Sequence, residues 1–243
     1  MKIPFLLLLL LLVPFLPLAA QEDDAFPEKQ TLRNLSDQSD RFYFTSGGEF
    51  IFSFADVEYR GNDDGTILRF APILNIQSYF NYDPNEYVGF FAGFAIRNVG
   101  FIYDLPNSDI RKKYRTYNFG IPVGLKLGRM NRTFLYGGYE LELPFHYKEK
   151  TFVDGDKEDK FSVWFGSRTA PVMNSIFVGI QLPRAANLKF KYYLTGFFNQ
   201  DFRTTDSAGQ PVFPYADIQA NVFYISLSFN ILRNKDIVID DAI

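Results

Sequence analysis

Hydrophobic and polar side chains alternate along two C-terminal segments of the chain, residues 187–199 and 218–231. In the second segment, apolar residues occupy every second position from Phe223 to Ile231, and hydroxyl and amide side chains fill the positions between them. A β-strand has a side-chain period of two, so each set lies on one face. The pattern predicts strands with one aromatic, apolar face and one polar face, which is typical of transmembrane β-barrels.

Similar alternation begins near Gly47 and recurs along the chain, which predicts about eight strands. The links between them alternate between short turns, such as Asp83–Asn85, and long loops, such as 148–171. The sequence therefore predicts an all-β fold, an antiparallel up-and-down meander that closes into a transmembrane β-barrel. The expected strands are 47–58, 67–81, 87–103, 113–128, 133–147, 174–183, 187–199 and 217–232.

A soluble β-sandwich or lipocalin-like barrel would show the same alternation with its apolar face turned inward. Three features favour the membrane barrel. Large aromatic residues follow one another on the apolar face at Phe50, Phe52 and Phe54, and the loop lengths alternate. The polar face carries many glycines, which suits a narrow, packed interior. These glycines are Gly89, Gly93, Gly120, Gly124, Gly138 and Gly179.

The N-terminal segment has the features of an export signal. Lys2 precedes an apolar run over residues 5–13, and small residues end the segment at Ala20. The run is too short for a membrane-spanning helix, which needs about 20 residues, so cleavage is expected. The absence of cysteine excludes a lipid anchor on cysteine and a disulfide framework. The expected organisation is a signal peptide over 1–20, a flexible periplasmic leader over 21–40, an outer-membrane barrel over 41–232 and a periplasmic tail over 233–243.

Composition agrees with this organisation. Aromatic residues make up 18% of the chain, as the aromatic girdles of a barrel require. The mean hydropathy of -0.10 resembles that of a soluble protein, because only alternate residues of a barrel strand face lipid. The net charge of -3 provides no basic surface for nucleic acid.

With the apolar face outward, a set of charged residues points into the barrel. The interior of a barrel of about eight strands is just wide enough to be filled by side chains, so its charges must pair or meet trapped water. One interpretation is a salt-bridge network that closes the lumen, and the other is a gated ion path or a binding site. Neither is an open diffusion porin, which needs about 16 strands. The predicted inward charges are Glu49, Arg69, Arg97, Lys126, Glu140, Glu142, Lys189 and Lys191, with His146 near the outer rim.

No catalytic site is expected. The single histidine, His146, has no serine or aspartate two or three residues away, where small barrel lipid A deacylases carry a His-x-Ser pair. A serine from another strand leaves a lipid-modifying hydrolase as an alternative. The turn Asn62–Gly65 lacks the spaced ligands of an EF-hand. We therefore predict no enzyme activity, no cofactor and no metal.

The longest predicted loop carries the only tryptophan, Trp164, next to Phe165. One interpretation is an aromatic anchor at the level of the lipid headgroups. The other is a contact surface for a partner or ligand, because exposed aromatic residues often anchor interfaces.

Residues 117–126 and 187–194 resemble strands of the small outer-membrane β-barrel proteins of Bacteroidetes-type bacteria, often labelled porin-family or PorT-like. The first stretch looks like that family's strand with a proline-containing apolar run that ends in lysine, here Pro122 to Lys126. The resemblance covers most of residues 41–232 and implies fold and outer-membrane location, not an activity. Many barrels end on a terminal aromatic residue, whereas here Phe229 is followed by residues 230–243.

The expected role is structural or interaction-based, through the loops or the periplasmic ends of the barrel. Some relatives in the resembling family serve a protein secretion system, so an accessory component of a secretion complex is one alternative. A narrow channel and a lipid-modifying hydrolase are the others. The expected partners are outer-membrane lipid and secretion or envelope proteins, with no nucleic acid.

Overall fold

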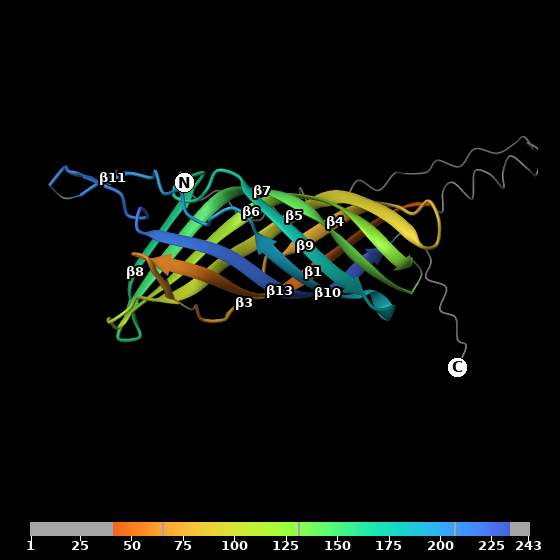
Figure 1. The fold of residues 1–243 in the computed structure, drawn as a ribbon, viewed down its shortest axis with the longest axis horizontal. Coiled ribbons are helices and arrows are strands. Elements are labelled where there is room, and N and C mark those ends of the chain that lie inside the picture. The colour runs from red at the N-terminus through yellow and green to blue at the C-terminus, as the bar shows by residue number, and fades with distance from the viewer. Residues whose placement is uncertain (1–40, 65, 131, 207, 234–243) are drawn as a thin grey trace, which may run out of the picture. The chain divides into compact units, whose positions relative to one another are not determined.

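The computed structural model describes residues 41–233 except 65, 131 and 207. These residues form an antiparallel sheet whose first and last long strands pair, which closes a ring of eight strands (Figure 1). The predicted all-β up-and-down barrel is confirmed. The predicted signal peptide, the predicted leader and residues 234–243 of the predicted tail lie outside the described residues.

Strands that neighbour each other in the ring mostly follow one another in the sequence. In ring order they are β1 (Phe42–Tyr59), β4 (Ile76–Tyr82), β5 (Val88–Asp104), β6 (Ile110–Arg129), β7 (Thr133–Val153), β9 (Met173–Gln181), β10 (Ala186–Tyr193) and β13 (Ile218–Arg233). The closing pair aligns β1 with β13 so that Phe54 lies opposite Phe223. A short strand, β3 (Arg69–Ala71), also pairs with β1 and shares one place in the ring with β4.

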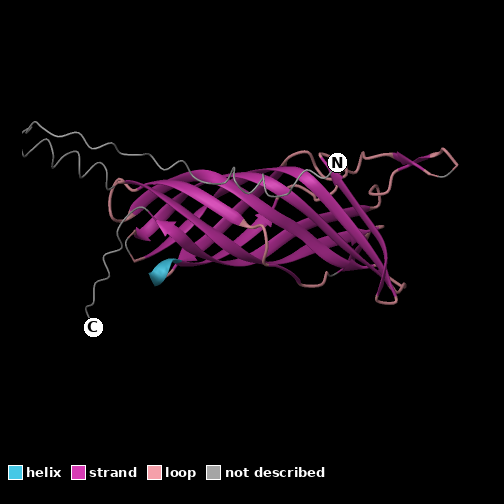
Figure 2. Cartoon of the chain, turned by 180° about the vertical axis from the view of Figure 1, so that it is seen from behind, coloured by secondary structure: helices cyan, strands magenta, loops and turns pink. Residues whose placement is uncertain are grey.

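The two ends of the barrel differ in their connections. At one end, here called the turn end, short links join β4 to β5, β6 to β7 and β9 to β10, the last through a 3-10 helix at Pro183–Ala185 (Figure 2). At the other end, the loop end, longer segments carry the small strands β2 (Asn62–Asp64), β8 (Asp156–Trp164), β11 (Thr204–Thr205) and β12 (Pro211–Val212). Within the described ranges, no helix is both long enough and apolar enough to cross a membrane.

Side chains alternate between the outside and the interior, as the period of a strand requires. On β10, Leu188 and Phe190 are exposed, whereas Lys189 and Lys191 between them are buried. A soluble protein buries leucine and phenylalanine and leaves lysine in water. The barrel has the opposite arrangement, which matches a surface that faces hydrocarbon.

Charged strands extend the barrel at the loop end, where the sequence predicted a loop over 148–171. Strand β7 continues to Val153 and pairs there with β8. Both faces of such a pair can meet water, so neither needs to be apolar, and the hydrophobic period that reveals a strand is absent. Lysine, glutamate and aspartate make up most of the sequence from 148 to 160.

Two other predicted strands differ from the observed ones. The predicted strand 67–81 is split into β3 and β4 by residues 72–75, where Pro72 has no N–H to donate and Leu74 has a φ of +61°. The predicted strand 187–199 ends at Tyr193.

A β-bulge interrupts the pairing of β7 with β6. Tyr117 lies opposite His146 and Asn118 lies opposite Pro144, so Phe145 is an extra residue on β7. One extra residue shifts the alternation of faces by one position. Every residue beyond the bulge therefore points to the face opposite to that given by a strict period of two.

The consequence is visible along β7. Glu140 and Glu142 are buried before the bulge, and Tyr147 is buried after it. His146 and Lys148 consequently face outward. The prediction that His146 points inward near the outer rim is wrong, because it assumed an unbroken period through this strand.

Candidate functional site

The interior of the barrel is divided into three layers along its axis. Strand β5 passes through all of them, with Phe91 at a pocket near the turn end, Arg97 in a charged layer and Phe101 in an aromatic layer near the loop end. Side chains fill the interior of an eight-stranded barrel, so these layers decide what passes through it.

The charged layer consists of three cations and three carboxylates, all buried. Arg97 is fully buried, and its guanidinium binds the carboxylate of Glu49 and, at 3.2 Å, that of Glu140. The Lys189 ammonium lies 2.7 Å from Glu49. The members of the charged layer are Glu49, Arg97, Glu140, Glu142, Lys189 and Lys191.

Lys191 continues the network between the two glutamates of β7. Its ammonium lies 2.7 Å from Glu140 and also contacts Glu142. The Tyr193 hydroxyl donates to Glu142 at 2.7 Å, and the Asn118 amide donates to it at 2.6 Å. Each carboxylate therefore has several donors, which is what a buried charge requires to offset its loss of water.

Gln77 of β4 belongs to this layer although its type gave no signal in the sequence. Its side-chain oxygen accepts hydrogen bonds from Arg97 at 3.1 Å and from Tyr79 at 2.7 Å. Its place on the inward face of a predicted strand is the one indication in the sequence, because glutamine carries no charge that would require a buried partner.

Two predicted inward charges lie apart from the charged layer. Arg69 donates to the backbone oxygen of Asn98 at 3.2 Å and also contacts its side-chain oxygen. Lys126 lies near the turn end, 2.5 Å from Asp83. Arg69 therefore ties β3 to β5 and lines a hollow with Lys113, Arg115 and Lys148, apart from the lumen network in which it was predicted. Lys126 belongs to the pocket.

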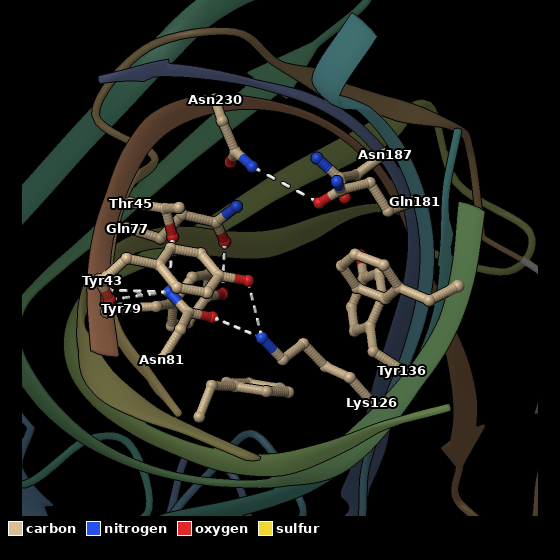
Figure 3. A pocket seen from close by; sticks show the side chains of 12 residues that line it. Tyr43, Thr45, Gln77, Tyr79, Asn81, Lys126, Tyr136, Gln181, Asn187 and Asn230 are labelled. Atoms are coloured by element: carbon tan, nitrogen blue, oxygen red, sulfur yellow. Dashed lines mark hydrogen bonds between the residues drawn. The ribbon is translucent and has the colours of Figure 1, made fainter. Parts of the chain in front are cut away.

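That pocket has a volume of about 40 Å³, which is room for a few water molecules. Figure 3 shows Lys126 reaching toward Tyr43 and Asn81, to which its ammonium donates at 2.8 Å and 3.1 Å. Asn230 and Gln181 on the far wall are joined at 3.5 Å. The pocket is a small cavity lined by amide and aromatic side chains, nearer to the turn end than the charged layer.

The aromatic layer is built partly by loop residues that turn into the barrel. Phe198 packs against Tyr114 with ring centroids 4.9 Å apart and against Tyr215 at 4.5 Å. The backbone N–H of Phe197 donates to Ala220 at 2.7 Å, which holds this segment against β13. Phe197 and Phe198 are adjacent in sequence yet both buried, so they break the period of two and were missed as interior residues.

Trp164 and Phe165, predicted as loop contacts, lie at the end of β8 and are 62% and 81% exposed. The Trp164 ring lies 4.4 Å from that of His146, and the His146 ring lies 5.5 Å from that of Tyr117. These rings form an outward aromatic cluster. The buried Nδ1 of His146 has no hydrogen-bond partner among the described residues.

Comparison with known proteins shows that this chain resembles several solved structures in its fold. No family model matches the sequence, and no curated protein matches it. The chain is similar to the solved structure of Ail, the attachment invasion locus protein of Yersinia pestis, at 11% identity and a TM-score of 0.36, over 79% of this chain and 99% of that one.

It is also similar to neisserial surface protein A, at 10% identity and a TM-score of 0.35 over 78% of this chain and 97% of that one. The outer-membrane protein OprG of Pseudomonas aeruginosa matches at 12% identity and a TM-score of 0.26, over 80% of this chain and 96% of that one. At these identities and TM-scores, nothing about the activity, ligand or partners of this chain follows from those proteins.

Proposed function

We propose that this chain is an integral protein of the bacterial outer membrane, exported by its N-terminal signal, with a closed, charge-lined lumen and an interaction role at its loop end. Insertion is supported by the outward face, where Phe94 and Leu127 are about half exposed while the lysines of β10 are buried. A closed barrel with an apolar outside satisfies its backbone hydrogen bonds internally, as the hydrocarbon core demands.

The observation that carries the closed lumen is the charged layer. Its three cations and three carboxylates balance in charge and bond to one another from β1, β5, β7 and β10. An ion passing through would have to displace these pairs in a low-dielectric interior, which is costly. The aromatic layer around Phe198 forms a second barrier above it.

The interaction role is supported by strand length. A transmembrane β-strand needs about 9–11 residues. Strand β6 has 20 residues and β7 has 21. With apolar outward positions ending near Phe119 and Leu143, the rest of β6 and β7 continues with β8 as a polar extension at the loop end. We propose that lipid covers the apolar belt and that an envelope protein contacts this extension.

Outer-membrane fractionation and planar-bilayer recording test the proposal. We expect the chain in the outer membrane, with a gel mobility that changes on boiling and no unitary conductance under conditions in which an open porin conducts. Unitary conductance would overturn the closed lumen in favour of a narrow channel. Recovery in the soluble fraction would overturn membrane insertion.

Two further outcomes separate the remaining alternatives. Co-purification with a large secretion complex would assign the chain an accessory role there, whereas an isolated barrel would count against it. An altered lipid A or phospholipid profile on overexpression would favour a hydrolase that uses His146.

A further inference from the structure

Cations crowd together on the outward face of the polar extension. Lys113 lies directly opposite Lys150, Lys150 lies opposite Lys160, and Arg115 lies opposite Lys148. Side chains directly opposite on adjacent strands have Cβ atoms about 5 Å apart, and like charges in such pairs repel. The bulge at Phe145 places Lys148 and Lys150 on this face rather than in the lumen.

Among the described residues, none of the four cations nearest the bulge forms an ion pair. Lys113, Arg115, Lys148 and Lys150, here called the cationic groove, have no carboxylate within 4.0 Å among the described residues. Two nearby acids are bound by other cations. Asp104, on the same face, is bound by Arg111 at 2.6 Å, and Glu149, between the two lysines of β7, is bound by Lys112 at 3.0 Å.

The cationic groove is a hollow rather than a flat surface. Its volume is about 270 Å³, and its walls also include Arg69, Phe70 and Ile73 from the segment where β3 and β4 are separated. Burial, together with the neighbouring Arg115, holds the pKa of Lys148 and that of Lys150 below the usual value for lysine. The site is therefore partly desolvated and positively charged, a combination that an anion would stabilise.

The cationic groove lies beside the outward aromatic cluster, which indicates its level relative to the membrane. Arg115 lies 5.1 Å over the ring of Tyr117, next to the outward aromatic cluster that includes Trp164. Aromatic girdles mark the interface between hydrocarbon and headgroups. On one side of the groove, Phe70 and Ile73 are 54% and 68% exposed and present an apolar surface.

We infer that the cationic groove binds the phosphate-bearing headgroup of a lipid in the surrounding leaflet, with its acyl chains against Phe70 and Ile73. The cations match the phosphate in charge, and the adjoining apolar wall matches the chains. The inference goes beyond the proposed function, although it rests on the barrel lying in a membrane. Lipid would thus hold the extension in a fixed orientation at the membrane surface.

Native mass spectrometry of the folded full chain in a neutral detergent tests the inference. The probes are diphosphorylated lipid A, the same lipid after enzymatic removal of its phosphates, and inorganic phosphate. We expect the phosphorylated lipid to be retained about tenfold more tightly than the dephosphorylated lipid, and inorganic phosphate at equal concentration not to displace it. The triple variant R115Q/K148Q/K150Q should lose about tenfold or more in affinity.

A matched control removes the same charge elsewhere. The exposed residues Arg41, Arg129 and Arg203 provide the variant R41Q/R129Q/R203Q, which should keep its affinity within about twofold. Equal loss in both triple variants, or equal retention of the dephosphorylated lipid, would overturn the inference. Displacement by inorganic phosphate would show that the groove takes free anions instead. Gel mobility before and after boiling reports folding separately, so failure to form a barrel is distinguishable from failure to bind.

Discussion

Arg97 connects strands that are not neighbours in the ring. It extends from β5 and bonds to Glu49 on β1 and Glu140 on β7, so one guanidinium spans the lumen. Its planar fork of donors suits two carboxylates at once, which a lysine could not replace. The other two cations, Lys189 and Lys191, each reach these carboxylates from β10.

Removing the guanidinium should destabilise the barrel strongly. We expect R97L to lower the free energy of unfolding by about 3–5 kcal/mol, because Glu49 and Glu140 would each lose a buried partner. Urea unfolding in detergent, followed by the gel-mobility change, measures this. The exposed-arginine control R129L should stay within about 0.5 kcal/mol. A loss below about 1 kcal/mol for R97L would mean that water solvates the layer.

The sequence predicts correctly which charged residues point inward when they lie on a regular strand. Glu49, Lys189 and Lys191 lie on unbroken stretches, so a period of two assigns their face directly. The partners within the layer do not follow from the period, because ring order and strand register decide which inward residues share a level. The period continued along the predicted strand 187–199 would place Phe198 on the outward face, whereas it is buried, because it lies in a segment that leaves the strand and turns inward.

At the scale of elements, the bulge in β7 determines the chemistry of the extension. Strict alternation from Glu142 would direct Lys148 and Lys150 into the lumen, beside the aromatic layer. The extra residue directs them outward and brings Tyr147 inward instead. Sequence alone gives little sign of the bulge, because Phe145 fits the apolar face and the inserted position becomes evident only from the pairing with β6.

Single cysteines can test this reversal, since the chain has no cysteine of its own. We expect K148C to react with a membrane-impermeant maleimide about tenfold or more faster than Y147C, because the latter position is buried. Labelling of intact cells followed by a mass shift on a gel measures the two rates. The opposite order would mean that the period continues unbroken through β7.

The hairpin of β7 and β8 should be dispensable for the ring. Because β8 pairs only with β7 in the described sheet, replacing residues 149–161 by Asn-Gly leaves Lys148 and Ser162 as the pair that closes a two-residue turn. We expect the shortened barrel to keep its heat-dependent gel mobility and to lose affinity for phosphorylated lipid. Loss of the folded band would show that the extension helps to form the barrel.

At the scale of the whole molecule, the lumen has two barriers in series. The charged layer closes it by paired ions and the aromatic layer by packing, and the two lie at different levels along the axis. Either barrier alone should be sufficient to block ion conduction, because an ion must pass through both layers to cross the barrel.

Opening one barrier therefore should not create a channel. We expect F198A, which leaves the charged layer intact, to fold and to show no unitary conductance in planar bilayers, although it costs about 3–5 kcal/mol in stability. The complementary variant R97L should also show no unitary conductance, because its aromatic layer remains intact. Unitary steps from either variant would show that its remaining layer passes ions.

The pairing of β1 with β13 constrains how this protein comes into existence. These strands lie at opposite ends of the described sequence, yet their contact closes the ring. No barrel can exist until the ribosome has released the last strand, and the unfinished sheet has two unpaired edges that invite association with other chains. Whatever delivers the chain to its membrane must therefore shield the edges of β1 and β13 until they can meet each other.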